Sequence, residues 1–153
     1  MNRPRLQIIR GMPGSGKTTL AVKRYPHLLR FESDMYFTRA GRYKFTKKRN
    51  AEAVDWFLTN VSLVTNFDKI DFVITGVFAA HTERLQHCID QALLNGYEVY
   101  IKTLKNDFGN IHNVPKAHLD AMRAAFVSDR ELKEKYKGCK RIHFGLMSKE
   151  LKV

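Results

Sequence analysis

The chain has 153 residues, 44% of them hydrophobic, and this size and composition suit a single domain that covers residues 1–153 and has a real core. No apolar run approaches the roughly 20 residues that span a bilayer, and the first residues lack a secretory signal, so we expect a cytoplasmic protein. The formal net charge of +12 favours a polyanionic partner, most often nucleic acid, although a basic protein without such a partner has the same composition.

The first half of the chain predicts strands and helices in alternation. Residues 6–10 form a short apolar strand, and a glycine-rich turn leads from it into a helix over about residues 17–24. A second short strand ends near Ser33. A long helix is predicted near residues 47–65, because five apolar residues recur there at the helical period, namely Val54, Phe57, Leu58, Val61 and Val64.

The second half continues the alternation. Residues 71–75 form an apolar strand typical of a sheet covered on both faces. The next helix has Thr82 as its N-cap and Gly96 just beyond its end, and it is followed by a fourth strand over residues 97–104.

Two further helices and an edge strand complete the prediction. Pro115 opens one helix at a position where its missing N–H costs nothing, and Ser128 with Glu131 resembles the capping box of another. Residues 141–144 are a candidate edge strand. The pattern predicts a three-layer α/β fold with a small, mainly parallel sheet. The two cysteines match no metal-ligand spacing, and we expect both as reduced thiols.

Residues 11–18, GMPGSGKT, satisfy the pattern G-x-x-x-x-G-K-[ST], with a strand directly before and a helix directly after. The glycines let the backbone curl so that its N–H groups form a nest for anionic oxygens, and the helix adds its positive end. Lys17 can reach the β- and γ-phosphates of a nucleotide, and the Thr18 hydroxyl can ligate Mg²⁺. We therefore expect ATP or GTP to bind with Mg²⁺ at nine residues: Gly11, Met12, Pro13, Gly14, Ser15, Gly16, Lys17, Thr18 and Thr19.

Asp34 follows the second predicted strand, at the sheet edge where ligands of open α/β sheets bind. A carboxylate there can take the proton from an attacking hydroxyl, but it can equally cap a turn. Residues 39–49 then contain six cations and no acid, with aromatic residues interleaved. Cations for phosphates and rings for stacking bases suit a single-stranded nucleic acid, whereas a solvated helix start has a similar composition. The candidate contacts are Arg39, Arg42, Tyr43 and Lys44.

In this order, the segments IIRGMPGSGKTTLA, FESDMYFTRAGRYKF and GNIHNVPKAHLDAM resemble the P-loop 5′-polynucleotide kinases, which include the kinase domain of the phage polynucleotide kinase–phosphatase. The resemblance covers most of the chain. It implies a kinase-type P-loop fold with a lid at about residues 105–115, and transfer of the γ-phosphate of ATP to the 5′-hydroxyl of RNA or DNA. It also implies that Asp34 is the general base, that Lys17 binds phosphate and that Thr18 ligates the metal. The matching or substituting lid residues are Lys105, Asn110, His112 and Lys116.

Two positions depart from the family pattern. Gly76 stands where the third strand of the family commonly carries an aspartate, and Gly109 stands where the lid carries an arginine that clamps the transferred phosphoryl group. No arginine occurs between Tyr100 and Met122. Because such an arginine is worth roughly 10³–10⁵ in rate, two alternatives stay open. One is a P-loop kinase of a small molecule or nucleotide, and the other is a catalytically weak, nucleotide-dependent nucleic-acid-binding protein.

Overall fold

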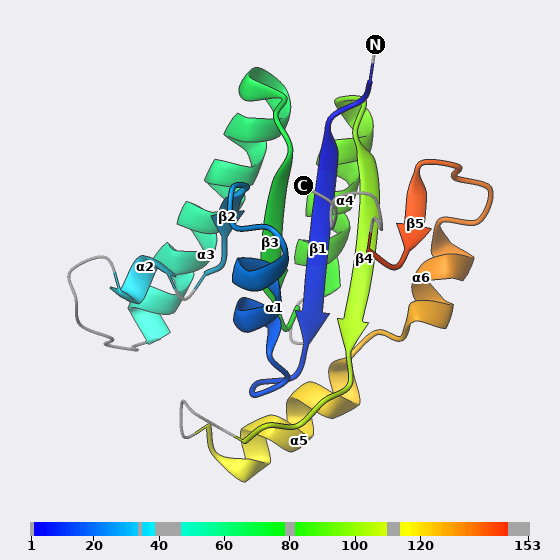
Figure 1. Cartoon of the computed structure of the whole chain (residues 1–153). Helices are drawn as coiled ribbons and strands as arrows, with labels where there is room; N and C mark the ends of the chain where they lie inside the picture. The colour runs from blue at the N-terminus through cyan, green and yellow to red at the C-terminus, as the bar shows by residue number, and fades with distance from the viewer. Residues whose placement is uncertain (1, 34, 39–46, 79–81, 110–113, 147–153) are drawn as a thin grey trace.

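The computed structural model describes residues 2–33, 35–38, 47–78, 82–109 and 114–146. Its five strands form one sheet in the order β2-β3-β1-β4-β5, and the four pairings between them are parallel (Figure 1). The strands are β1 (Arg5–Gly11), β2 (Leu29–Phe31), β3 (Phe72–Gly76), β4 (Glu98–Leu104) and β5 (Ile142–Phe144). The predicted small parallel sheet, its edge strand included, is confirmed.

The helices alternate with these strands along the chain. They are α1 (Lys17–Arg24), α2 (Met35–Thr38), α3 (Lys47–Leu63), the π-helical turn η1 (Val64–Asp68), α4 (Thr82–Leu94), α5 (Lys116–Ala125) and α6 (Asp129–Lys135). The long helix predicted over residues 47–65 is observed, but it continues as η1. The Thr65 hydroxyl bonds back to the Val61 carbonyl at 2.9 Å, and the N–H of Lys69, in the left-handed region, closes the turn on the Val64 carbonyl at 2.7 Å.

The two faces of the sheet carry cores of different size. Leu6, Ile8, Phe72 and Ile74 point to a large core that α3, α4 and α6 cover. The alternate positions Ile9 and Val73 point the other way, to a small cluster with Ala21 of α1 and Tyr25 just after it. Figure 1 shows α1 on one side of the sheet and α3 and α4 on the other. The three-layer α/β fold class is therefore confirmed.

The ends of the helices match the sequence signals closely. Gly96 lies past α4 with φ at 84°, and the N–H of Tyr97 bonds the Ala92 carbonyl at 2.9 Å, as in a glycine-terminated helix. Ser128 caps α6 by accepting a bond from the Glu131 N–H at 3.1 Å. Two predicted starts are displaced by one residue, because α4 begins at Thr82 itself and Pro115 precedes α5 as its N-cap.

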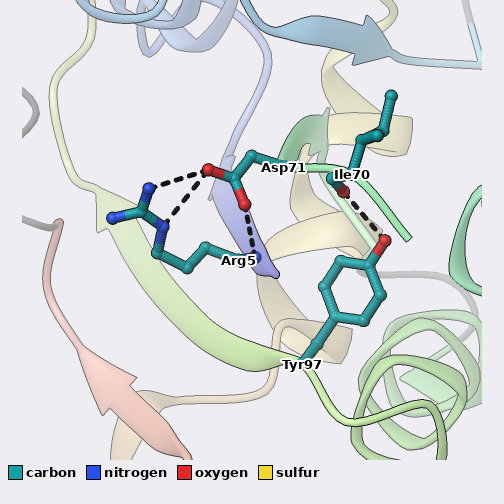
Figure 2. Close-up of polar contacts among 4 residues, drawn as sticks. All are labelled: Arg5, Ile70, Asp71 and Tyr97. Carbon is teal, nitrogen blue, oxygen red and sulfur yellow. Dashed lines mark hydrogen bonds and ion pairs between the residues drawn. The ribbon is translucent and has the colours of Figure 1, made fainter. Parts of the chain in front are cut away.

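The amino ends of the central strands are fixed by polar contacts (Figure 2). Asp71, just before β3, accepts bonds from the backbone N–H of Arg5 at 2.8 Å and from its guanidinium at 2.9 Å. The Tyr97 hydroxyl donates to the Ile70 carbonyl at 2.8 Å. These contacts hold β1 and β3 in register, so that the loops at the opposite, carboxyl edge come together in one place.

Within the segments described, no helix has both the length and the apolar character needed to cross a bilayer. Cys88 is buried in the large core and Cys139 is partly buried, and neither forms a disulfide. Burial raises the pKa of the Cys88 thiol to about 12, so it stays protonated as an apolar core group.

Candidate phosphate-binding site

The glycine-rich loop connects the carboxyl end of β1 to α1. Gly14 and Gly16 have φ of 81° and 89°, values that side chains disfavour. The Ser15 N–H closes a turn on the Met12 carbonyl at 3.1 Å. A Cβ on Gly11 would lie only 2.5 Å from the Ser15 hydroxyl oxygen. The curled loop therefore requires glycine at three of its positions.

The loop has the features of an anion cradle. The Ser15 side chain is buried, and its hydroxyl has no hydrogen-bond partner among the described residues. No side chain caps the start of α1, so the first turn of that helix directs its N–H groups into the loop. The Lys17 ammonium group lies against the loop and donates to the Met12 carbonyl at 3.1 Å. Phosphate oxygens are the ligands that this arrangement fits.

A carboxylate that the sequence analysis missed lies beside Thr18. The Thr18 hydroxyl donates to Oε2 of Glu32 at 2.9 Å, and the Thr75 hydroxyl donates to the same oxygen at 2.9 Å. The other oxygen, Oε1, forms an ion pair with Arg30. Glu32 directly follows β2, and its side chain is 17% exposed. The signal that could have found it is its place two residues before Asp34, at the same strand end.

Gly76 has a structural reason to be glycine. A Cβ there would lie 2.9 Å from Cε2 of the Phe78 ring. Phe78 has φ at 58°, unusual for a bulky residue, and its ring packs against Phe57 with the centroids 6.1 Å apart. The ring thus occupies the space that an aspartate side chain on β3 would enter.

The segment that follows β4, residues 105–109, lies on the phosphate loop, and we refer to it as the strap. The Phe108 N–H donates to the Gly14 carbonyl at 2.8 Å, and a Cβ on Gly14 would lie 2.0 Å from the Gly109 carbonyl oxygen. The Phe108 ring lies 3.2 Å from the place of a Cβ on Gly16. Gly109 itself has φ at 106°, which an arginine rarely adopts. An arginine at this position would therefore strain the observed backbone.

A polar network around a buried arginine lies directly before the loop. Arg10, the residue before Gly11, is 1% exposed. Its guanidinium donates to the Thr103 hydroxyl at 3.0 Å and to the Asp129 carboxylate at 2.9 Å, and it lies 4.6 Å from the centre of the Phe126 ring. The Thr103 hydroxyl also donates to Asp129 at 2.6 Å. This brace ties the end of α5 and the start of α6 to β1 and β4.

The charge state of the brace follows from these contacts. Burial alone would raise the pKa of Asp129, but the hydrogen bonds from Thr103 and Arg10 and the charge of Arg10 outweigh it, so the pKa is held below its ordinary value. Burial lowers the pKa of Arg10, although a guanidinium stays charged near neutral pH. The brace is therefore an ion pair.

The remaining predicted residues are placed only in part. Lys105 is exposed in the strap, and Lys116 is exposed at the start of α5. None of the residues of α5 is buried, and Figure 1 shows this helix beyond the carboxyl ends of β1 and β4. The other substrate, base and lid candidates lie outside the described residues, namely Asp34, Arg39, Arg42, Tyr43, Lys44, Asn110 and His112.

A hollow of about 760 Å³ lies at the amino edge of the sheet, away from the phosphate loop. Its lining includes Arg3, His27, Lys69 and the pair Arg5 and Asp71. Arg5 and Asp71 form an ion pair with each other there. The candidate chemistry is at the opposite edge.

No protein-family model matches the chain. Solved structures do share its fold. AvrRxo1-ORF1:AvrRxo1-ORF2 with ATP superimposes with a TM-score of 0.60 at 15% identity, over 88% of this chain and 51% of that one. The Pnkp1/Rnl/Hen1 RNA repair complex gives 0.55 at 14% identity, over 99% and 42%. Kti12 of Chaetomium thermophilum in complex with ADP-AlF3 gives 0.56 at 12% identity, over 96% and 93%.

The chain thus spans about half the length or less of the first two structures, and nearly the whole of the third. All three likenesses lie below 20% identity, and they bear on the arrangement of strands and helices alone. These likenesses show that the chain shares the α/β fold of these solved structures, and it has a parallel sheet with a glycine-rich loop between β1 and α1.

Proposed function

We propose that the chain is a nucleotide-dependent phosphotransferase that moves the γ-phosphate of ATP to the 5′-hydroxyl of a nucleic acid. The observation that carries the proposal is the phosphate loop: left-handed glycines, a buried Ser15 hydroxyl without a described partner, and an uncapped helix start. ATP is the preferred donor in this proposal because similar structures hold ATP or ADP-AlF3. GTP would fit the same phosphate cradle.

The reaction needs a base at the acceptor hydroxyl. The hydroxyl oxygen attacks the γ-phosphorus, the bond from that phosphorus to the β–γ bridging oxygen breaks, and ADP leaves. In our proposal the hydroxyl proton passes to Asp34. Glu32 lies beside Thr18 of the phosphate loop. Asp34 follows Glu32 by two positions in the chain, which supports this assignment.

A metal ion accompanies the nucleotide in this reaction class, and the structure offers a fitting group of ligands. The Thr18 hydroxyl and the Glu32 carboxylate are hard oxygen groups 2.9 Å apart, next to the cradle for the phosphates. We propose Mg²⁺, with Thr18 as its protein ligand. When bound, the ion neutralises charge that develops on the phosphate oxygens.

The proposed acceptor is a nucleic acid for reasons of charge and composition. The net charge is +12, and residues 39–49 place six cations with aromatic residues just after Asp34. Phosphates pair with the cations and bases stack on the rings, and neither contact depends on sequence. One similar structure, Pnkp1, comes from an RNA repair complex, which supports this acceptor class.

The proposal is tested with γ-labelled ATP and an oligonucleotide that has a 5′-hydroxyl. We expect Asp34→Asn to lose transfer by a factor of at least about 10² while its Kd for ADP is unchanged, since a general base contributes roughly 10²–10⁴ to rate. Asp68→Asn is the matched control, because Asp68 precedes β3 at the amino edge. Equal transfer by the Asp34 variant and the control would remove Asp34 from the mechanism.

A second candidate, a kinase of a small molecule or nucleotide, is favoured by one observation. No arginine occurs between Tyr100 and Met122, and the strap holds Gly109 at the family's arginine position. A site without the arginine that contacts the transferred phosphoryl group suits a different acceptor. If oligonucleotides neither accept phosphate nor inhibit ATP turnover, the acceptor is a small molecule. Retained binding of ADP and oligonucleotide with negligible turnover would identify the catalytically weak binding protein instead.

A further inference from the structure

We infer that Glu32 takes the part of the acidic residue that β3 lacks, and that it completes the divalent-cation site with Thr18 when a nucleotide is bound. The inference rests on the proposed function and names a residue of the same site. It assigns the metal-side carboxylate to the strand β2 rather than to β3, where Gly76 ends the strand.

The first support is the contact itself. In a P-loop the hydroxyl at the position of Thr18 turns to the metal that accompanies the phosphates. Here that hydroxyl donates to Oε2 of Glu32 at 2.9 Å. A carboxylate bonded to this hydroxyl lies within reach of the cation or of its bound water. Oxygen ligands of this kind suit Mg²⁺ or Mn²⁺.

The second support is the strand register. Phe31 of β2 pairs with Ile74 of β3, so Glu32 is level with Thr75. The Thr75 hydroxyl donates to the same Oε2 at 2.9 Å, and thus β3 supplies a donor to this carboxylate in place of an acid of its own. Since β2 lies one strand further from β1 than β3 does, about 4.8 Å, the reach back to α1 suits glutamate better than aspartate.

The third support is that a side chain at Gly76 would collide with a neighbouring ring, whereas the Glu32 side chain is held in place by several contacts. The Phe78 ring lies 2.9 Å from the position of a Cβ on Gly76, so an aspartate there would require the ring to move. Glu32 is gripped from three sides, by Thr18, Thr75 and the ion pair with Arg30. Its side chain is only 17% exposed, so its orientation is set before any ligand arrives.

This cation site depends on the nucleotide. Among the described residues no group of three or more histidine, cysteine or acidic side chains could hold a metal ion. One carboxylate and one hydroxyl are too few ligands for Mg²⁺, which completes its shell with phosphate oxygens and water. We therefore expect tight metal binding only in the presence of ADP or ATP.

The test measures ADP binding by calorimetry in EDTA and in Mg²⁺, without any assay of activity. Mg²⁺ should lower the Kd of the wild-type protein for ADP. In Glu32→Gln this Mg²⁺-dependent gain in affinity should be smaller by a factor of about ten or more, while the Kd for ADP in EDTA stays unchanged. Glu98→Gln is the matched control, since Glu98 begins β4 at the amino edge and accepts a bond from His143 at 2.9 Å. It should keep the full Mg²⁺ effect.

The outcomes separate the inference from the proposed function. If the wild-type protein binds no ADP, the proposed function fails and the inference fails with it. If the wild-type protein binds ADP more tightly in Mg²⁺ and Glu32→Gln does so equally, only the inference is overturned. If Glu32→Gln loses the same affinity for ADP in EDTA and in Mg²⁺, Glu32 has only a structural role, and the inference is overturned. If Glu32→Gln does not fold, Glu32→Asp tests the reach argument by the same two titrations, with a reduced Mg²⁺ effect expected.

Discussion

Gly14 and Gly138 have nearly the same backbone conformation, with φ of 81° and 85°, but different surroundings. A Cβ on Gly14 would lie 2.0 Å from the Gly109 carbonyl oxygen, whereas a Cβ on Gly138 would meet nothing within 4 Å. Alanine at either site forces a side chain into the left-handed region. Only at Gly14 does it also collide with the strap, so the pair separates backbone strain from contact with the strap.

We predict that Gly138→Ala lowers the free energy of unfolding by about 1–2 kcal/mol, the cost of the left-handed conformation, and leaves the Kd for ADP unchanged. Gly14→Ala should pay the same conformational cost and in addition displace the strap and break the bond from the Phe108 N–H. Its Kd for ADP should rise by about tenfold, the equivalent of an overpacking strain of 1–3 kcal/mol. Urea denaturation and calorimetric titration measure the two effects. The same Kd in both variants would mean that the strap does not shape the loop.

At the scale of whole elements, the brace of Arg10, Thr103 and Asp129 joins three of them, β1, β4 and α6. Arg10 lies in β1 directly before Gly11, the first residue of the phosphate loop, and Asp129 begins α6. The bond between them is 2.9 Å long, and Arg10 is buried at 1% exposure. Removing the acid would leave an uncompensated buried guanidinium, which is costly. We therefore expect the brace to set both the stability and the acid sensitivity of the fold.

We predict that Asp129→Asn lowers the free energy of unfolding at about pH 7 by roughly 1–3 kcal/mol, since the amide keeps a hydrogen-bonding oxygen but not the charge. The folded pKa of Asp129 lies below its ordinary value, so its contribution is present above the unfolded value of about 3.9 and is lost as the pH falls through the folded value. Wild-type stability should therefore fall more steeply below about pH 4 than that of the variant.

The control for this prediction is Asp120→Asn on α5. Asp120 is exposed and lies 3.8 Å from Arg123, a weak surface pair. Its replacement should change the free energy of unfolding by no more than about 0.5 kcal/mol. Parallel pH dependences for Asp129→Asn and the wild-type protein, measured by urea denaturation, would show that the brace does not titrate as described.

Elements with strong local signals were predictable, and those set by tertiary contacts were not. Glycine at 96 and serine at 128 marked helix ends correctly, because each acts on its own backbone. The π-helical turn after α3 was missed, since it depends on how Thr65 bonds back within the helix. β2 ends at Phe31, two residues before the predicted end near Ser33, and it pairs with β3 over its three residues.

The same distinction applies to the candidate site. The phosphate loop is a contiguous motif, and its glycines carry their own conformational evidence. Glu32 was overlooked because an acid after a strand has the same signature as a turn cap, and only the fold brings it to Thr18. Arg10 and Asp129 lie 119 positions apart, and no local pattern links them. The departure at Gly76 was visible, but its cause, the Phe78 ring, was not.

The two ends of the sheet differ throughout the molecule, because all four strand pairings are parallel. Segments that follow strands gather at the carboxyl edge with the phosphate loop, and segments that precede strands gather at the amino edge. Arg3, Lys69 and Lys137 precede β1, β3 and β5 and are exposed. Arg39, Arg42 and Lys44 follow β2 in the chain. Two sets of three cations thus allow a comparison at equal net charge.

We predict that affinity for a single-stranded oligonucleotide falls steeply with salt, with a logarithmic slope of about 0.7 for each phosphate that the protein neutralises. Replacing Arg39, Arg42 and Lys44 by glutamine should reduce that slope by about 2, whereas replacing Arg3, Lys69 and Lys137 should leave it nearly unchanged. Both variants lose three charges, so a general electrostatic attraction would change them equally. Fluorescence anisotropy over a salt series measures the slopes, and equal slopes in the two variants would mean that the bound strand does not follow the segment after Asp34.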